Sequence, residues 1–246
     1  MTGERPRRPE MRPSVTLLVP TYNEIEGMRQ IMPQIQHGWC DQILIVDGGS
    51  TDGTQEYARE HGYDLIVQQK PGIRNAYVEA FPHVRGEIVV TFSPDGNSLP
   101  SAIPDLVRAM AAGADMVIAS RYLAPARSQD DDVLTALGNW GFTRLINLLH
   151  GGRYTDAFVM FRAYRTTLFR DLGLDRDEGY APEKLLGTVI GVEPLLSIRA
   201  AKKRLTVSEI PADEPPRIGG ERKLQMFRWG AAYLLQTLRE VYYWRP

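Results

Sequence analysis

Cysteine is almost absent from this chain, because Cys40 is the only one among 246 residues. A single cysteine excludes a disulfide within the chain, and it fits a protein that works in a reducing compartment, here expected to be the cytoplasm. No partner motif accompanies Cys40. We therefore expect it to pack or to lie at the surface rather than to act as a nucleophile.

Long apolar runs and a strong net charge are also missing. No uncharged apolar stretch approaches the ~20 residues that a membrane-spanning helix needs. The formal net charge of −1 gives no argument for nucleic acid as a partner. Residues 1–13 hold four arginines, two glutamates and three prolines without a following apolar segment, which excludes a secretory signal. We expect a disordered basic arm over 1–13, a folded domain over 14–222 and an amphipathic helix over 223–246.

The first half of the chain alternates short apolar runs with helix-like segments. Strands are expected over 15–19, 42–46, 65–68, 87–92 and 115–119, and helices over 24–35, 54–61, 72–81 and 101–112. This alternation predicts an α/β fold in which a mostly parallel sheet is flanked by helices.

The rhythm breaks in the second half. The polar stretch 121–137 is predicted to be a mobile loop and is followed by a helix over 138–150. Two further strands are expected over 158–161 and 205–210, and a long helix over 224–242.

Polar residues follow the first two predicted strands directly. Pro20-Thr21-Tyr22-Asn23-Glu24 comes after one, and Asp47-Gly48-Gly49-Ser50-Thr51 after the other. Ligands of open α/β sheets bind at the carboxyl ends of strands. Carboxylates there accept hydrogen bonds from a ribose or base, and glycines let a ligand approach the backbone. The two strand ends therefore predict one nucleotide pocket.

Several ordered motifs carry a resemblance to a known family. They are V-P-T-Y-N-E (19–24), V-D-G-G-S-T-D-G-T (46–54), G-I-R-N-A-Y-V-E-A-F (72–81), G-E-I-V-V-T-F-S-P-D-G-N (86–97), A-S-R-Y (119–122) and T-D-A-F-V-M-F-R (155–162). With them the chain resembles the family 2 glycosyltransferases of GT-A (Rossmann-like) fold, in particular the dolichyl-phosphate mannosyltransferase or polyprenyl-phosphate branch. The resemblance implies a nucleotide-sugar donor, a divalent metal and inversion at the sugar carbon.

The resemblance also implies the donor-binding residues. They are Pro20, Thr21, Tyr22, Glu24, Asp47, Gly48, Arg74, Asp95 and Gly96. Gly48 stands where the family usually has a second acid, so one carboxylate contact is lost. Ile73 occupies the position of a family lysine, and the neighbouring Arg74 could replace the charge of that lysine.

The central motif is Ser93-Pro94-Asp95-Gly96-Asn97, where the family pattern is Asp-x-Asp. Ser93 replaces the first acid, so Asp95 and Asn97 are the expected ligands of Mg²⁺ or Mn²⁺, ions that prefer oxygen ligands and donor phosphates. The same residues could form a tight Pro-Asp-Gly turn. A nucleotide-sugar-binding relative without activity is therefore one alternative.

The remaining site residues depend on the acceptor. A hydroxyl acceptor needs a general base, for which Asp156 is the candidate. A lipid phosphate is already an anion and needs cations instead. The resemblance implies a catalytic set of Asp95, Asp156, Arg121 and Arg162, and an acceptor-phosphate set of Arg121, Arg217, Arg222 and Lys223. The favoured acceptor is a polyprenyl phosphate, and a glycan or small glycoside is the alternative.

The terminal helix is basic, amphipathic and ends in the aromatic residues 242–244. Such a helix suits a membrane interface, which would make the protein peripheral on the cytoplasmic face. It equally suits packing on the sheet or a homodimer contact.

Overall fold

The computed structural model describes residues 12–218 and 226–246. Its strands are β1 (Val15–Thr21), β2 (Gln42–Asp47), β3 (Asp64–Val67), β4 (Ile88–Thr91), β5 (Met116–Ser120), β6 (Arg162–Arg165) and β7 (Val207–Pro211). They form one sheet in the order β3-β2-β1-β4-β6-β5-β7. Only β6 runs antiparallel to its neighbours, which confirms the mostly parallel sheet.

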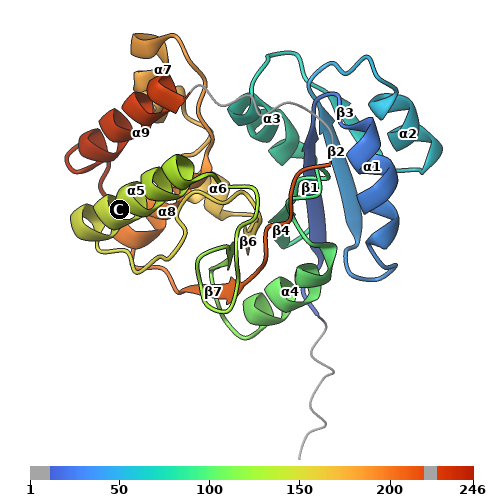
Figure 1. The fold of residues 1–246 in the computed structure, drawn as a ribbon, viewed down its shortest axis with the longest axis horizontal. Coiled ribbons are helices and arrows are strands. Elements are labelled where there is room, and N and C mark those ends of the chain that lie inside the picture. The colour runs from blue at the N-terminus through green and yellow to red at the C-terminus, as the bar shows by residue number, and fades with distance from the viewer. Residues whose placement is uncertain (1–11, 219–225) are drawn as a thin grey trace, which may run out of the picture.

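Helices cover both faces of this sheet (Figure 1). They are α1 (Ile25–Ile31), α2 (Thr54–Glu60), α3 (Ile73–Ala80), α4 (Ile103–Ala111), α5 (Val133–His150), α6 (Leu168–Asp171), α7 (Ala181–Leu186), α8 (Glu193–Lys202) and α9 (Met226–Glu240). One apolar core lies between the sheet and α1, α2 and α4. The other core joins the opposite face to α3, α6 and α8, with α5 and α9 outside them.

The apolar runs explain β1, β2, β4 and β5, whose side chains are almost all buried, whereas the edge strand β3 is only partly buried. Val15, Leu17 and Val19 face one core, whereas Leu18 faces the other. This two-sided burial is what a parallel sheet between helical layers requires. The chain is a single α/β domain, as predicted.

Two expected elements differ from the structure. The loop predicted over 121–137 ends early, because Asp132 accepts a hydrogen bond from the Thr135 amide (2.7 Å) and starts α5 at Val133. The strand predicted over 158–161 is displaced to Arg162–Arg165. The amides of Phe158 and Val159 bind the Asp156 carboxylate and do not join the sheet.

The terminal parts of the chain are described incompletely. The amphipathic helix is confirmed as α9 over Met226–Glu240. Of the expected basic arm, Arg12 pairs with Asp41 (2.9 Å), and residues 1–11 lie outside the described residues. In the described part of the chain, no helix combines the length and apolarity that crossing a membrane requires.

Candidate functional site

The candidate site lies beside β1, where the order of the strands in the sheet reverses. Strands β2 and β3 extend from one side of β1, and β4 begins the other side. In open sheets this switch point places a crevice at the carboxyl ends of the strands. Thr21 is in register with Asp47, so the two polar segments of the sequence begin side by side.

Hydrogen bonds join these two segments into one structure. Asn23 has a positive φ of 55°, and its side-chain oxygen accepts from the Thr51 amide (2.9 Å). The Asn23 amide in turn donates to Ser50 Oγ (2.7 Å), and the Glu24 amide to Thr54 Oγ1 (3.1 Å). The structure therefore places the two segments side by side, and they carry the predicted residues Pro20, Thr21, Tyr22, Glu24, Asp47 and Gly48.

Asp47 is the centre of this loop. Its carboxylate is fully buried and accepts hydrogen bonds from the amides of Gly49 (3.0 Å) and Ser50 (2.7 Å). It also accepts from Thr21 Oγ1 (3.0 Å) and Gln55 Nε2 (2.7 Å). Asp47 thus shapes the turn from within, and a contact with a nucleotide requires one of these partners to give way.

Gly48 explains how the loop packs without the family's second acid. A Cβ at this position would lie 3.2 Å from the Tyr22 ring and 3.2 Å from Gln68 Oε1. Any side chain would displace both. Tyr22 itself is half-exposed and presents an aromatic face beside the loop.

The Asp95 turn follows β4, the strand next to β1, and is tightly packed. Gly96 has a φ of +90°, and a Cβ there would meet Ile218 Cγ1 at 2.7 Å. The Ile218 amide donates to the Asp95 carbonyl (2.7 Å), and Arg217 Nη1 pairs with the Asp95 carboxylate (3.1 Å). The segment before residue 219 therefore covers the turn.

The oxygens of this turn fit a hard divalent cation. Asp95 faces a positive group, Arg217. The side-chain oxygen of Asn97 is buried without a hydrogen-bond partner among the described residues. Carboxylate and amide oxygens are ligands that Mg²⁺ and Mn²⁺ accept. The described residues contain no cluster of three or more His, Cys, Asp or Glu side chains that could hold a metal.

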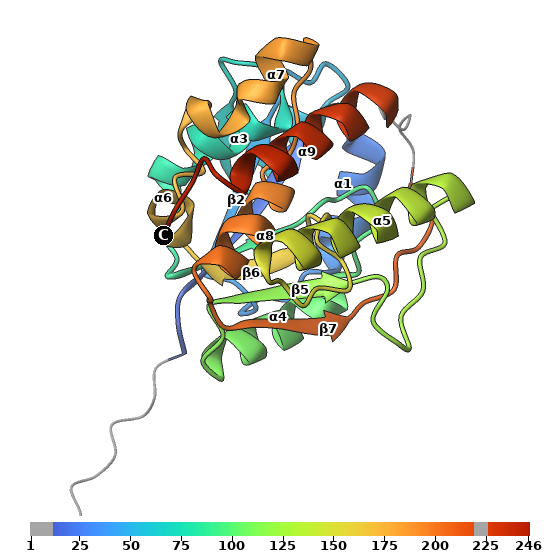
Figure 2. The ribbon, with the colours of Figure 1, turned by 90° about the vertical axis from the view of Figure 1, so that its left-hand side faces the viewer.

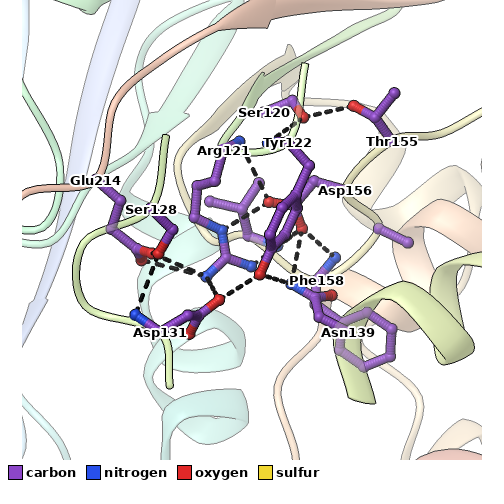
Figure 3. Close-up of polar contacts among 12 residues, drawn as sticks. Ser120, Arg121, Tyr122, Ser128, Asp131, Asn139, Thr155, Asp156, Phe158 and Glu214 are labelled. Carbon is purple, nitrogen blue, oxygen red and sulfur yellow. Dashed lines mark hydrogen bonds and ion pairs between the residues drawn. The ribbon is translucent and has the colours of Figure 1, made fainter. Parts of the chain in front are cut away.

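Arg121 lies at the carboxyl end of β5 in a cluster of carboxylates (Figure 3). Its Nε donates to Asp156 Oδ2 (2.6 Å) and its Nη2 to Asp156 Oδ1 (3.1 Å). Its Nη1 reaches Glu214 (3.2 Å) and Asp131 (3.6 Å). One guanidinium is therefore shared by three acids, and the acceptor-phosphate role predicted for Arg121 is at odds with this surrounding negative charge.

The electrostatics of the pair follow from its burial. Burial alone would raise the pKa of Asp156, but the Arg121 charge and hydrogen bonds outweigh it and hold that pKa below its ordinary value. Burial lowers the pKa of Arg121, but the charge of Asp156 and its hydrogen bonds raise that pKa by more, so the net shift is upward. Asp156 also accepts from the Phe158 and Val159 amides. This carboxylate is a poor proton acceptor.

Arg162 and Arg74 differ from their predicted roles. Arg162 is fully buried and donates to the Val159 carbonyl (2.8 Å) and Ser197 Oγ (3.0 Å). It holds the segment after Asp156 against α8, which is a positioning role. Arg74 pairs with Glu183 (3.1 Å) and Asp177 (2.8 Å), so two acids already balance its charge.

Two acids of the cluster were missed in the sequence. Glu214 binds Arg121 and Ser128 because residue 128 forms an isolated parallel bridge with residue 214. Burial raises the pKa of Glu214. Asp131 accepts from Tyr122 Oη, although its acidic run looked like a mobile loop. Only their proximity to Arg121 in the folded chain marks these two acids, and the spacing of residues along the sequence could not reveal that proximity.

Arg222 and Lys223, which were predicted to bind the acceptor phosphate, lie outside the described residues.

The fold is shared with solved structures. Glucosyl-3-phosphoglycerate synthase from Mycobacterium tuberculosis, in complex with Mn²⁺, uridine diphosphate and glucosyl-3-phosphoglycerate, superposes with a TM-score of 0.66 at 20% identity. The match covers 98% of this chain and 86% of that one. At this identity the likeness concerns the fold.

Sequence relatives extend over most of the chain. Glycosyltransferase AglJ of Haloferax volcanii is 28% identical, over 93% of this chain and 72% of its own. Undecaprenyl-phosphate mannosyltransferase of Micrococcus luteus is 27% identical, over 92% and 97%. Dolichol-phosphate mannosyltransferase of Pyrococcus furiosus is 26% identical over 93% of this chain, which spans 62% of that relative. The profile of glycosyl transferase family 2 matches residues 16–173, and the chain belongs to this family.

Proposed function

We propose that this protein is an inverting, metal-dependent glycosyltransferase that moves a sugar from a UDP- or GDP-sugar to a polyprenyl phosphate. Family membership supports the transferase activity. The names of two relatives, an undecaprenyl-phosphate and a dolichol-phosphate mannosyltransferase, support the acceptor class.

The observation that carries the acceptor proposal is the state of Asp156. It is the carboxylate that the family pattern offers as a general base, yet it is buried, paired bidentately with Arg121 and has a lowered pKa. A hydroxyl acceptor must lose a proton as the new bond forms, so it needs a competent base. A phosphate acceptor is ionised already and needs none.

The donor diphosphate is proposed to bind at the Asp95 turn. Asp95 and Asn97 would hold the divalent metal, with donor phosphates as further ligands, and the metal would neutralise the charge on the leaving diphosphate. The structural neighbour was solved in complex with Mn²⁺ and uridine diphosphate, which supports a divalent metal and a nucleotide donor. Tyr22 and Glu24 would contact the base and ribose from the adjacent loop.

Among the described residues, Arg217 is proposed to bind the acceptor phosphate. It lies beside Asp95, and its Nε–H is buried without a hydrogen-bond partner among the described residues. A guanidinium suits bidentate phosphate contacts. Arg222 and Lys223 would add to this charge.

The reaction is a single displacement. A phosphate oxygen of the acceptor attacks the anomeric carbon from the face opposite the diphosphate. The bond between that carbon and the donor oxygen breaks, and the nucleoside diphosphate leaves with the electron pair. The product is a sugar joined to the lipid through one phosphate, with inverted configuration.

The test compares two acceptors that differ only in the phosphate. The protein is incubated with UDP- and GDP-sugars, Mn²⁺ or Mg²⁺, and either a polyprenyl monophosphate or the matching polyprenol. Transfer to the phosphate alone supports the proposal. Nucleotide binding without transfer to any acceptor would instead indicate a non-catalytic relative and overturn it.

A second candidate is a transferase for hydroxyl acceptors. The observation in its favour is the cluster of three acids around one arginine, which repels phosphate. Within it Glu214 has a raised pKa and could serve as the base. Transfer to a glycan or glycoside that is lost in Glu214→Gln, with nucleotide binding retained, would establish this candidate.

A further inference from the structure

The Asp95 turn has one carboxylate where the family motif has two. Ser93 takes the place of the first acid. Of the two Asp95 carboxylate oxygens, Oδ1 accepts from the Asn97 amide (3.1 Å) and Oδ2 pairs with Arg217 (3.1 Å). The affinity of a site for a divalent cation depends on the charge and rigidity of its ligands. A single carboxylate makes a weak site, so a second would have to come from another part of the chain.

Asp130 brings a second carboxylate to this turn from a distant loop. It lies in the connection between β5 and α5, 33 residues after Asn97. Asn97 Nδ2 donates a hydrogen bond to Asp130 Oδ2 (3.1 Å). This contact joins the loop to the turn that is proposed to hold the metal.

Contacts of the neighbouring backbone fix the position of Asp130. The Gln129 amide donates to the Glu214 carbonyl (2.8 Å), and the Asp131 amide donates to Ser128 Oγ (3.2 Å). Figure 2 shows the loop running beside the segment that follows β7, where residues 128 and 214 form a parallel bridge. Because the backbone is held on both sides of Asp130, the fold of the loop itself carries this side chain to the turn.

The three consecutive acids of this loop have different partners. Asp131 pairs with Arg121 (3.6 Å), and Asp132 caps the start of α5. Asp130 contacts Asn97 instead. Asp132 therefore explains how the helix begins and Asp131 how the arginine cluster forms, whereas Asp130 meets the site of the proposed metal.

The spacing fits neighbouring ligands of one ion. In an octahedral site with metal–oxygen distances of about 2.1 Å, adjacent ligand atoms lie about 3 Å apart. Asp130 Oδ2 and Asn97 Nδ2 have this separation, at 3.1 Å. A half-turn of the amide group exchanges its nitrogen and oxygen, and Asn97 Oδ1 is buried without a hydrogen-bond partner among the described residues. The amide can thus present its oxygen to a cation beside Asp130.

We propose that Asp130 is a ligand of the divalent metal and replaces the carboxylate that the family motif loses at Ser93. This inference rests on the proposed function, in which Asp95 and Asn97 hold the metal. The protein then supplies two carboxylates and one amide, and donor phosphates and water complete the set of ligands.

The test measures metal binding without any transfer of sugar. Mn²⁺ is titrated into the protein with UDP or GDP, and the free ion is read from its electron paramagnetic resonance signal. Asp130→Asn keeps the size of the side chain and an oxygen that accepts from Asn97, but it removes the charge. It should weaken Mn²⁺ binding at least about tenfold. Mn²⁺ affinity equal to that of the wild type would overturn the inference.

Asp132→Asn is the matched control. It removes the same charge two residues further along the same loop, and asparagine still caps a helix. Its Mn²⁺ affinity should stay within about twofold of the wild type, because salt screens a charge outside the site. Equal losses in the two variants would overturn the inference, since net charge alone would then explain them. Ser93→Asp, which returns the family acid, should recover most of the affinity that Asp130→Asn loses.

Transfer assays separate this inference from the proposed function. Mn²⁺ binding that depends on Asp130, without transfer to polyprenyl phosphate, would refute the proposed reaction and leave the metal ligand in place. Transfer to polyprenyl phosphate by the wild type, together with unchanged Mn²⁺ binding by Asp130→Asn, would refute the ligand and leave the reaction in place.

Discussion

Replacing Arg121 with leucine should reverse the pH dependence of stability that Asp156 imposes. Asp156 is fully buried and Arg121 is its bidentate partner. Removing one member of a buried ion pair leaves an uncompensated charge and costs about 3–5 kcal/mol. We therefore expect Arg121→Leu to lower the free energy of unfolding at pH 7 by about this amount.

The sign of the pH effect follows from the pKa of Asp156. In the wild type it lies below the ordinary value of 3.8, so the ion pair stabilises the fold above about pH 4. That contribution is lost as the pH falls through the folded-state pKa. Without Arg121 the burial effect dominates and raises the pKa, so the native state takes up a proton before the unfolded chain does.

The variant should consequently recover stability on acidification. The difference from wild type should shrink by about 1.4 kcal/mol for each pH unit over which the carboxyl group is protonated only in the native state. Glu214 loses the same partner and shifts in the same direction. The measurement is urea unfolding at pH 7 and pH 5, read by circular dichroism.

Controls separate this effect from a general loss of stability. Arg108→Leu removes an exposed ion pair with Asp105 and should change stability by no more than about 0.5 kcal/mol at either pH. Adding Asp156→Asn to Arg121→Leu should remove most of the pH dependence. A deficit for Arg121→Leu that is equal at pH 7 and pH 5 would refute the reasoning.

Three further predictions concern the site and its support. Asp95→Asn should abolish the rise in melting temperature that Mn²⁺ adds to nucleotide binding, measured by thermal shift, and an unchanged rise would exclude Asp95 as a ligand. Gly27→Ala should destabilise the fold by about 1–3 kcal/mol in urea unfolding, because the new Cβ would lie 2.2 Å from the Pro94 carbonyl oxygen, and full stability would contradict this close approach. Tyr77→Phe removes the hydroxyl that donates to the buried Glu193 (2.7 Å) and should cost about 1–3 kcal/mol in the same assay, with no loss meaning that Glu193 finds another donor.

The sequence predicted the parts of this protein that depend on local pattern. Apolar runs bounded by turn residues located β1 and β2, because buried parallel strands must be apolar on both faces. The polar residues after them had to meet, since parallel strands end at the same edge. The Asp95 turn was visible for the same reason, as a Pro-Asp-Gly segment following β4.

Contacts between distant segments could not be predicted in this way. The role of Arg162 depends on carbonyls and a serine that only the folded α8 brings to it. Asp131 looked like part of a solvated acidic loop until Tyr122 and Arg121 were placed beside it. Charge and spacing identify candidate residues, whereas the partners that decide the protonation state come from the tertiary structure.

The ion pair between Arg217 and Asp95 connects the two halves of the proposed reaction. Asp95, the proposed metal ligand, is paired here with the Arg217 guanidinium at 3.1 Å. A divalent cation on Asp95 would compete with Arg217 for the carboxylate oxygens and would repel the guanidinium, so donor binding with its metal should weaken the contact between Arg217 and Asp95. The released guanidinium would then need a new anion, and an acceptor phosphate is the one that the reaction supplies. Donor binding would thereby prepare the acceptor site, and polyprenyl phosphate should bind more tightly after the nucleotide-sugar and metal than before them.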